Sequence, residues 1–122
     1  MPTEPAVILL VDDDEPTRDA TSECLTHAGF DVRVASNGQD ALDMLATLRP
    51  DLLIVDWRMP VMSGEELLAS VRADASLATI PALVLSGLRA EEIAVPNATI
   101  LQKPLRMAAL LGAVRERLRS PG

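Results

Sequence analysis

Aromatic residues and cysteine are nearly absent from this chain of 122 residues, which has one Trp, one Phe, no Tyr and one Cys. Few aromatic rings argue against modules that bind nucleic acid by stacking bases on such rings. The lone Cys24 excludes an internal disulfide and a metal cluster of several thiolates. With 48% hydrophobic residues, the sequence predicts a single domain over residues 1–122, with an aliphatic core spanning about 6–119.

Positive charge and long apolar runs are also scarce. Eighteen acidic residues against 11 basic ones give a net charge of −7, so direct nucleic-acid binding is not expected. A basic group near the C-terminus, Arg115, Arg117 and Arg119, is interpreted as a solvated helix face. No apolar run is long enough for a signal peptide or a membrane span. We therefore expect a cytoplasmic protein without membrane contact, and no output domain after residue 119.

Short aliphatic runs alternate with amphipathic stretches along the chain. Strands are expected at 7–11, 30–35, 52–55, 82–85 and 99–102. A helix opened by Pro16 is expected to run to about His27, and a turn is expected at Asn37-Gly38. Further helical stripes are formed by Ala41, Leu42, Leu45 and Leu48 (ended by Pro50), by Leu67, Leu68 and Val71, and by Met107, Leu111, Val114 and Leu118. The pattern predicts an α/β fold, a (βα)5 doubly wound parallel sheet with helices on both faces.

The connection between the fourth and fifth strands is short. Only residues 87–98 lie there, and they must hold two loops and a helix, near 89–94. An average helix alone takes about 11 or 12 residues. We therefore expect this fourth helix to be short, distorted or absent.

Polar side chains follow four of the five strands. Asp12 and Asp13 follow the first, Asp56 the third, Ser86 the fourth and Lys103, the only lysine of the chain, the fifth. Right-handed crossovers bring the carboxyl ends of all the strands to one edge of a parallel sheet. The predicted crevice therefore holds three carboxylates, one hydroxyl and one ammonium.

This combination of side chains favours a magnesium and phosphoryl site. Neighbouring carboxylates repel one another unless a cation offsets their charge. Mg²⁺ prefers oxygen ligands and keeps several waters, so Asp13 and Asp56 could bind it directly and Asp12 through a water, with Mn²⁺ as a second candidate. Lys103 and Ser86 could then hold oxygens of a phosphoryl group. Each motif alone has an ordinary explanation as a cap, a turn or a surface lysine, so the prediction depends on the combination.

Four segments, ILLVDDD, LLIVDWRMPVMSG, PALVLSG and LQKPL, together resemble the receiver domain of two-component response regulators. The resemblance covers about residues 6–119. It implies a flavodoxin-like sheet with strand order 2-1-3-4-5, as in chemotaxis receivers. It also implies that a sensor histidine kinase or a histidine phosphotransfer protein supplies a phosphoryl group. The domain would then change conformation and signal to a downstream output protein or domain, and the resemblance allows a homodimer.

By the same resemblance, Asp56 is the phosphoacceptor. Asp12 and Asp13 hold Mg²⁺ together with Asp56, and the backbone carbonyl of Arg58 is a further ligand. The domain would catalyse only its own Mg²⁺-dependent phosphorylation and dephosphorylation, so it is expected to be a phosphorylated signalling domain and not an enzyme with a separate substrate.

The resemblance assigns the other side of the site as well. Ser86 is the hydroxyl residue that turns toward the phosphoryl group, and Lys103 pairs with that group. The bond between Lys103 and Pro104 is a candidate cis peptide. Met59, Pro60 and Gly64 match the loop that shapes the site.

Several positions depart from the family's pattern. Ile100 stands where the family usually places an aromatic residue that turns inward on phosphorylation. A switch built on Ser86 and Ile100 would therefore lack the rotamer change of an aromatic side chain. Arg58 and Leu88, two positions after Asp56 and Ser86, are expected to tune the access of water to the phosphoryl group.

Two other functions remain open. A haloacid-dehalogenase-type phosphatase also uses a strand-end aspartate and Mg²⁺, but Pro16 stands where its D-x-D-x-T/V motif needs Thr or Val. The closer alternative is a degenerate receiver that acts only as a protein-interaction module. Ile100 and the short segment 87–98 favour the degenerate receiver, whereas the intact acidic residues oppose it.

Overall fold

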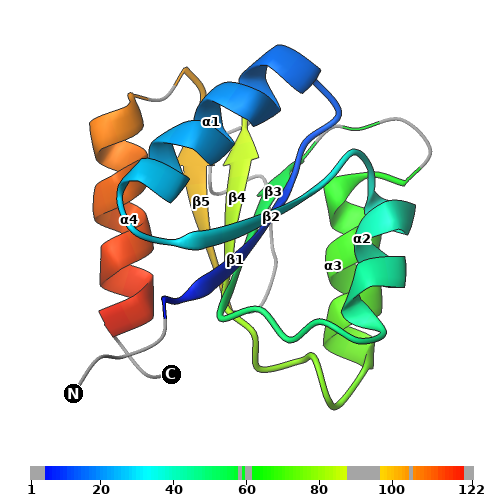
Figure 1. The fold of residues 1–122 in the computed structure, drawn as a ribbon. Helices are drawn as coiled ribbons and strands as arrows, with labels where there is room; N and C mark the ends of the chain where they lie inside the picture. The colour runs from blue at the N-terminus through cyan, green and yellow to red at the C-terminus, as the bar shows by residue number, and fades with distance from the viewer. Residues whose placement is uncertain (1–4, 58, 60–61, 88–96, 105, 120–122) are drawn as a thin grey trace.

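A computed structural model describes residues 5–57, 59, 62–87, 97–104 and 106–119, and strands and helices alternate in it from residue 7 to residue 86 (Figure 1). The strands are β1 (Val7–Val11), β2 (Asp31–Ala35), β3 (Leu52–Asp56), β4 (Ala82–Ser86) and β5 (Ala98–Gln102). The helices are α1 (Glu15–His27), α2 (Gly38–Leu45), α3 (Gly64–Ala73) and α4 (Met107–Arg119). The short helix expected near 89–94 lies outside the described residues.

The five strands form one parallel sheet in the order β2-β1-β3-β4-β5, which confirms the expected order. Helices α1 and α4 cover one face of the sheet, and α2 and α3 cover the other (Figure 1). Strands β3 and β4 are buried along their whole length, whereas the edge strands β2 and β5 are partly exposed. A continuous apolar run is therefore typical of the central strands of this sheet.

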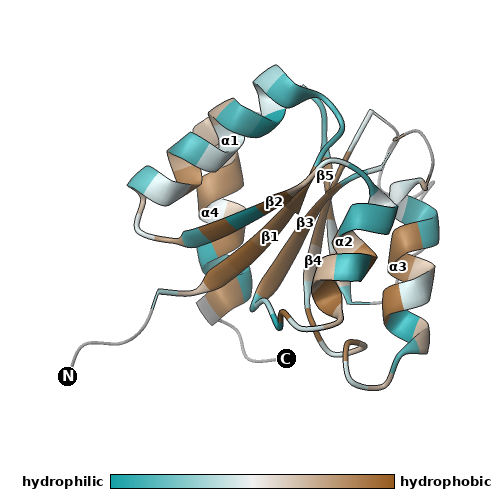
Figure 2. Ribbon diagram, turned by 45° about the vertical axis from the view of Figure 1, so that its right-hand side comes forward, coloured by the Kyte–Doolittle hydropathy of each residue, from teal (hydrophilic) through white to brown (hydrophobic). Residues whose placement is uncertain are grey.

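Successive side chains of a strand point to opposite faces of the sheet. Each central strand therefore contributes residues to the core on both faces. In β1, Leu9 and Val11 pack toward α2 and α3 in a first core cluster. Ile8 and Leu10 pack toward α1 and α4 in a second one. Figure 2 shows the result, with hydrophobic strands between helices that turn hydrophilic residues outward. No helix in the described part of the chain combines the length and the apolar character that a membrane crossing would need.

Two of the three helices that follow β1, β2 and β3 begin with an Asp or Asn cap. Asp14 caps α1 by accepting a hydrogen bond from the Thr17 N–H at 3.1 Å. Asn37 caps α2 by accepting one from the Asp40 N–H at 2.8 Å, so the expected turn at Asn37-Gly38 is wrong, because Gly38 is the first residue of α2. The third helix, α3, begins with a capping box between Ser63 and Glu66.

Three other expectations need correction. Helix α2 ends at Leu45 and not at Pro50, although Leu48 still packs against the first core cluster. In α4 the sequence stripe missed Leu110, which is buried with Val114. Arg117 does not simply face solvent, because its Nη2 donates to the Asn97 side-chain oxygen at 2.7 Å.

Candidate functional site

The carboxyl ends of β1 and β3 bring two of the expected acids together. Val11 of β1 pairs with Val55 of β3, so Asp12, which follows β1, and Asp56, the last residue of β3, lie side by side. Both carboxylates are buried, with relative exposures of 3% and 7%. A buried carboxylate is unusual without a partner, which distinguishes these two from most acids of the chain.

Asp13 completes a group of three acids. One carboxylate oxygen from each of Asp12, Asp13 and Asp56 lies within 4.8 Å of the others. Asp13 is exposed, so the group opens to solvent on its side. Three oxygen ligands at this spacing fit a hard divalent cation that keeps several of its waters.

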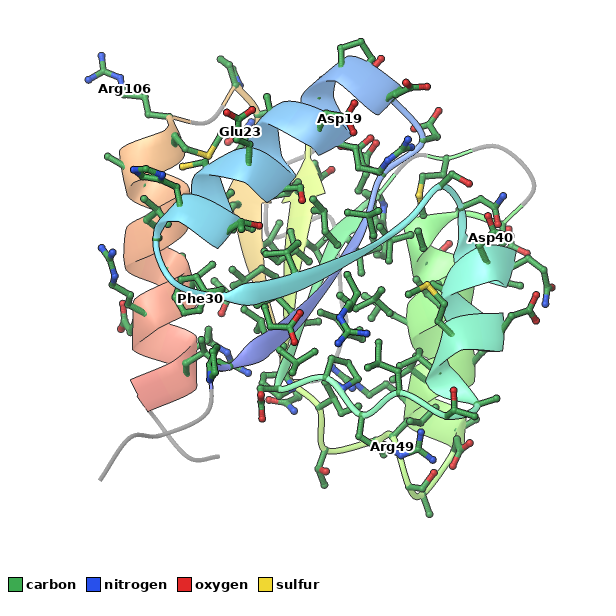
Figure 3. All side chains as sticks on the ribbon, in the orientation of Figure 1. Asp19, Glu23, Phe30, Asp40, Arg49 and Arg106 are labelled. Carbon is green, nitrogen blue, oxygen red and sulfur yellow. The ribbon has the colours of Figure 1, made fainter. Side chains whose placement is uncertain are left out.

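Not every acid near this end of the sheet belongs to the group. Asp19 and Glu23 lie on the outer surface of α1, and Asp40 lies on α2 (Figure 3). Asp40 accepts a hydrogen bond from the Ser36 hydroxyl at 2.7 Å. Among the described residues, these acids are not part of the group of three.

Lys103 lies on the other side of Asp56. Its Nζ is 2.8 Å from Asp56 Oδ1, in an ion pair whose lysine side chain is 41% exposed. The Lys103 N–H also donates to the Ser86 carbonyl at 2.7 Å, which continues the pairing of β5 with β4. The peptide bond between Lys103 and Pro104 is cis, as expected. The register of the sheet therefore places the ammonium beside the carboxylate.

Asp12 is held by three hydrogen bonds. Its N–H donates to the Ala35 carbonyl at 3.1 Å, and its Oδ1 accepts the Asp14 N–H at 2.9 Å. Its carbonyl accepts a hydrogen bond from Arg18 Nη1 at 3.0 Å. Arg18 was missed in the sequence, although its position one helical turn after the Asp14 cap is a usable signal.

The surroundings of Asp12 disfavour its charged form. Burial raises the pKa of the Asp12 carboxyl, and the nearby Asp56 and Asp13 carboxylates raise it further. The hydrogen bond from the Asp14 N–H and the charge of Lys103 lower it, with a smaller total effect. A cation bound between the three acids would reverse this balance.

A glycine shapes the backbone where the loop after Asp56 meets α3. The Gly64 N–H donates to the Trp57 carbonyl at 3.0 Å. A Cβ on Gly64 would lie 2.6 Å from the Asp56 carbonyl oxygen, so the close approach requires glycine. Met59 is buried, whereas Arg58 and Pro60 lie outside the described residues.

The two expected switch residues lie on neighbouring strands. Ser86 ends β4 and is 2% exposed. Ile100, on β5, is half-buried against the first core cluster. Ile100 pairs with Val84, two residues before Ser86, so both lie on the β4–β5 side of the site. Leu88 lies outside the described residues.

Comparison with known proteins decides the family. The model of the response regulator receiver domain family matches residues 8–115. The chain belongs to this family. Receiver domains are phosphorylated signalling modules rather than enzymes with a separate substrate, and they act with histidine kinases.

Individual relatives agree with this assignment. The response regulator MprA of Mycolicibacterium vanbaalenii is 34% identical over 120 residues, which cover 94% of this chain and 51% of that protein. The chain thus spans about half the length of the curated relatives it matches. The chemotaxis response regulator CheY4 of Vibrio cholerae is 32% identical, with a TM-score of 0.86 over 93% of this receiver and 98% of that chain.

A receiver attached to a kinase is also similar. The signal receiver domain of a signal transduction histidine kinase from Syntrophus aciditrophicus is 27% identical, with a TM-score of 0.86. The match covers 93% of this chain and 90% of that one. The fold of this receiver is therefore shared by receivers of response regulators and of kinases.

Proposed function

We propose that this receiver accepts a phosphoryl group on Asp56 in a Mg²⁺-dependent reaction. The observation that carries the proposal is the position of Asp56. Its buried carboxylate lies within 4.8 Å of the Asp12 and Asp13 oxygens and pairs with the Lys103 ammonium at 2.8 Å. A structural ion pair alone would not need two further acids beside it, because their repulsion costs stability.

The proposed reaction is a direct transfer from a phosphohistidine. An oxygen of the Asp56 carboxylate attacks the phosphorus, and the new P–O bond forms as the P–N bond breaks. The departing imidazole nitrogen keeps the bonding electron pair and takes a proton from solvent. Asp56 thus carries an acyl phosphate, a covalent intermediate of the kind formed by phosphorylated ATPases.

The chain's own side chains prepare the site for this transfer. Asp13 and Asp56 are the proposed direct ligands of Mg²⁺, and Asp12, whose Oδ1 already accepts the Asp14 N–H, is the proposed ligand through a water. The cation would offset the negative charge of the acids and of the phosphoryl oxygens. Lys103 is proposed to pair with one phosphoryl oxygen once Asp56 is phosphorylated.

Phosphorylation would add nearly two negative charges beside Asp56. The Ser86 hydroxyl is proposed to turn toward the new oxygens, and Ile100 is proposed to fill the space that this movement opens. Such a change biases two conformations that already exchange. The packing of Ile100 against the first core cluster supports a switch based on aliphatic repacking.

The proposed partners follow from the proposed chemistry. A sensor histidine kinase or a histidine phosphotransfer protein in the cytoplasm would supply the phosphoryl group, and an output protein or domain would read the switch. One receiver unit, residues 6–119, is proposed to carry these functions. A homodimer is a further proposal, and sedimentation with and without a phosphoryl mimic would show its presence or absence.

Trp57 offers a direct test because it adjoins Asp56 and is nearly buried. Mg²⁺ with beryllofluoride or acetyl phosphate should change the Trp57 fluorescence of the wild type. Asp56→Asn should not respond to either phosphoryl reagent. No response in the wild type, with binding of protein partners intact, would support the degenerate receiver that Ile100 favours, and repeated turnover of a phosphomonoester would indicate a phosphatase.

A further inference from the structure

The start of α2 lies against the loop that follows Asp56, at a contact between Gly38 and Met62. A Cβ added to Gly38 would lie 2.7 Å from Met62 Cγ, 2.8 Å from Met62 Cβ and 2.9 Å from Met62 Sδ. Optimal carbon–carbon separations are about 3.5–4.0 Å, so no side chain fits there without movement. Among the described glycines only Gly29 has a positive φ, so Gly38 provides space and not backbone freedom.

Met62 belongs to the segment that carries the site. Residues 57–63 connect the phosphoacceptor strand β3 to α3. At one end, the Trp57 N–H donates to the Leu85 carbonyl at 2.9 Å and fixes the loop to β4. Toward the other end, Met62 is half-buried against the first core cluster and touches the start of α2. Trp57 is thus held by β4, and Met62 lies against α2.

Gly38 itself is fixed. It is buried, and the preceding Asn37 holds the first turn of α2 through its hydrogen bond with the Asp40 N–H. Ala41 and Leu45, which follow on the same helix, are buried in the first core cluster. A new side chain at position 38 would therefore displace Met62 rather than the helix.

We infer that Gly38 is a positioning residue for the phosphoacceptor loop. It touches neither the carboxylate group nor a phosphoryl group, and it acts by allowing Met62 to approach α2. The inference rests on the proposed function, since the loop matters only if Asp56 and its neighbours hold Mg²⁺. A methyl group at position 38 should shift the loop and weaken Mg²⁺ binding.

The test is the Mg²⁺ affinity of wild type, Gly38→Ala and Gly112→Ala, measured by calorimetry. A Cβ on Gly112, in α4, would meet nothing within 4 Å, so this variant controls for the general helix-stabilising effect of Gly→Ala. We expect Gly112→Ala to bind Mg²⁺ as the wild type does. Gly38→Ala should bind roughly tenfold more weakly, within the range of coupling between contacting residues.

A second substitution separates displacement of the loop from damage to α2. Met62→Gly removes all three close atoms, Cβ, Cγ and Sδ, so Gly38→Ala combined with Met62→Gly should recover most of the lost affinity. If Gly38→Ala is too unstable to measure, the double variant should still bind Mg²⁺ nearly as Met62→Gly does.

The outcomes are distinct. Wild-type affinity in Gly38→Ala, or a double variant as weak as the single one, overturns this inference alone. Absence of Mg²⁺ binding in the wild type overturns the proposed function, and this inference with it.

Discussion

Removing the buried charge of Asp12 should stabilise the receiver in the absence of metal. Asp12→Asn keeps a side-chain oxygen that can accept the Asp14 N–H, so the local hydrogen bond of 2.9 Å survives. The substitution removes repulsion from Asp13 and Asp56 and loses attraction to Lys103. Because two repulsions are removed and only one attraction is lost, the substitution should give a net gain in stability.

The size of the gain follows from the spacing of the acids. Two unit charges 4.8 Å apart repel by about 1 kcal/mol in the dielectric of water and by about 3.5 kcal/mol at an effective dielectric constant of 20. The attraction to Lys103 offsets one of the two repulsions, so the equivalent of one repulsion remains. Burial of the Asp12 carboxylate adds to this cost. We therefore expect Asp12→Asn to raise the free energy of unfolding by about 1–3 kcal/mol.

Urea unfolding in EDTA at neutral pH measures this gain. With a slope of about 1–3 kcal/mol per molar, a gain of about 2 kcal/mol shifts the midpoint by roughly 1 M urea. Added Mg²⁺ should stabilise the wild type and have little effect on Asp12→Asn. Asp19→Asn, on the outer face of α1, is the matched control and should change stability by less than about 0.5 kcal/mol.

The sign of the pH dependence gives a second check. The pKa of Asp12 in the folded protein is raised above its ordinary value of 3.8, first by burial. The wild type therefore loses stability relative to Asp12→Asn as the pH rises through the raised pKa, and the difference closes below the ordinary value. Lower stability of Asp12→Asn in EDTA, or a gain that stays constant at all pH values, would refute the reasoning.

Three further substitutions test other parts of the structure. Asp14→Ala removes the cap of α1, so the melting temperature should fall while calorimetry shows unchanged Mg²⁺ affinity; a loss of affinity as large as that of Asp13→Ala would contradict the separate roles of these neighbours. Gly64→Ala should cost about 1–3 kcal/mol in urea unfolding, because its Cβ would meet the Asp56 carbonyl oxygen. Leu110→Ala should cost about 2–5 kcal/mol, clearly more than Leu111→Ala, and equal costs would contradict the packing of α4.

Much of the sheet could be predicted because its central strands are buried on both faces. The runs around Leu9, Leu53 and Leu83 are continuous and aliphatic, as is typical of parallel strands covered on both faces. The order of the strands came from the family resemblance alone, because hydrophobic periodicity does not say which strands are neighbours.

The errors came from local signals that tertiary structure overrides. Asn-Gly is a strong turn signal, but the Asn37 side chain instead caps α2. The apolar stripe continued to Leu48, whereas the helix ends at Leu45 and its last turn tightens, with the Ala46 N–H bonded to the Asp43 carbonyl. Periodicity identifies a buried face but does not fix where the helical hydrogen bonds stop.

The acids and the lysine of the candidate site could be predicted from their positions at strand ends. The neighbouring contacts that hold the site in place were not predicted. The positions of Asp12, Asp56 and Lys103 follow from the rule that parallel strands end at one edge. The hydrogen bond from Arg18 to the Asp12 carbonyl is local and was missed, whereas the contact between Gly38 and Met62 joins segments that are distant in the sequence. The contact between Gly38 and Met62 depends on how the helices pack on the sheet, which local sequence patterns do not determine.

The most direct test of the central claim is the intact mass of the receiver after incubation with acetyl phosphate. With Mg²⁺ present, we expect the wild type to gain the mass of one phosphoryl group, located on the peptide that contains Asp56. EDTA should prevent the gain, as should Asp56→Asn. A wild type that gains no mass, or an Asp56→Asn variant that gains as much as the wild type, would contradict the assignment of Asp56 as the phosphoacceptor.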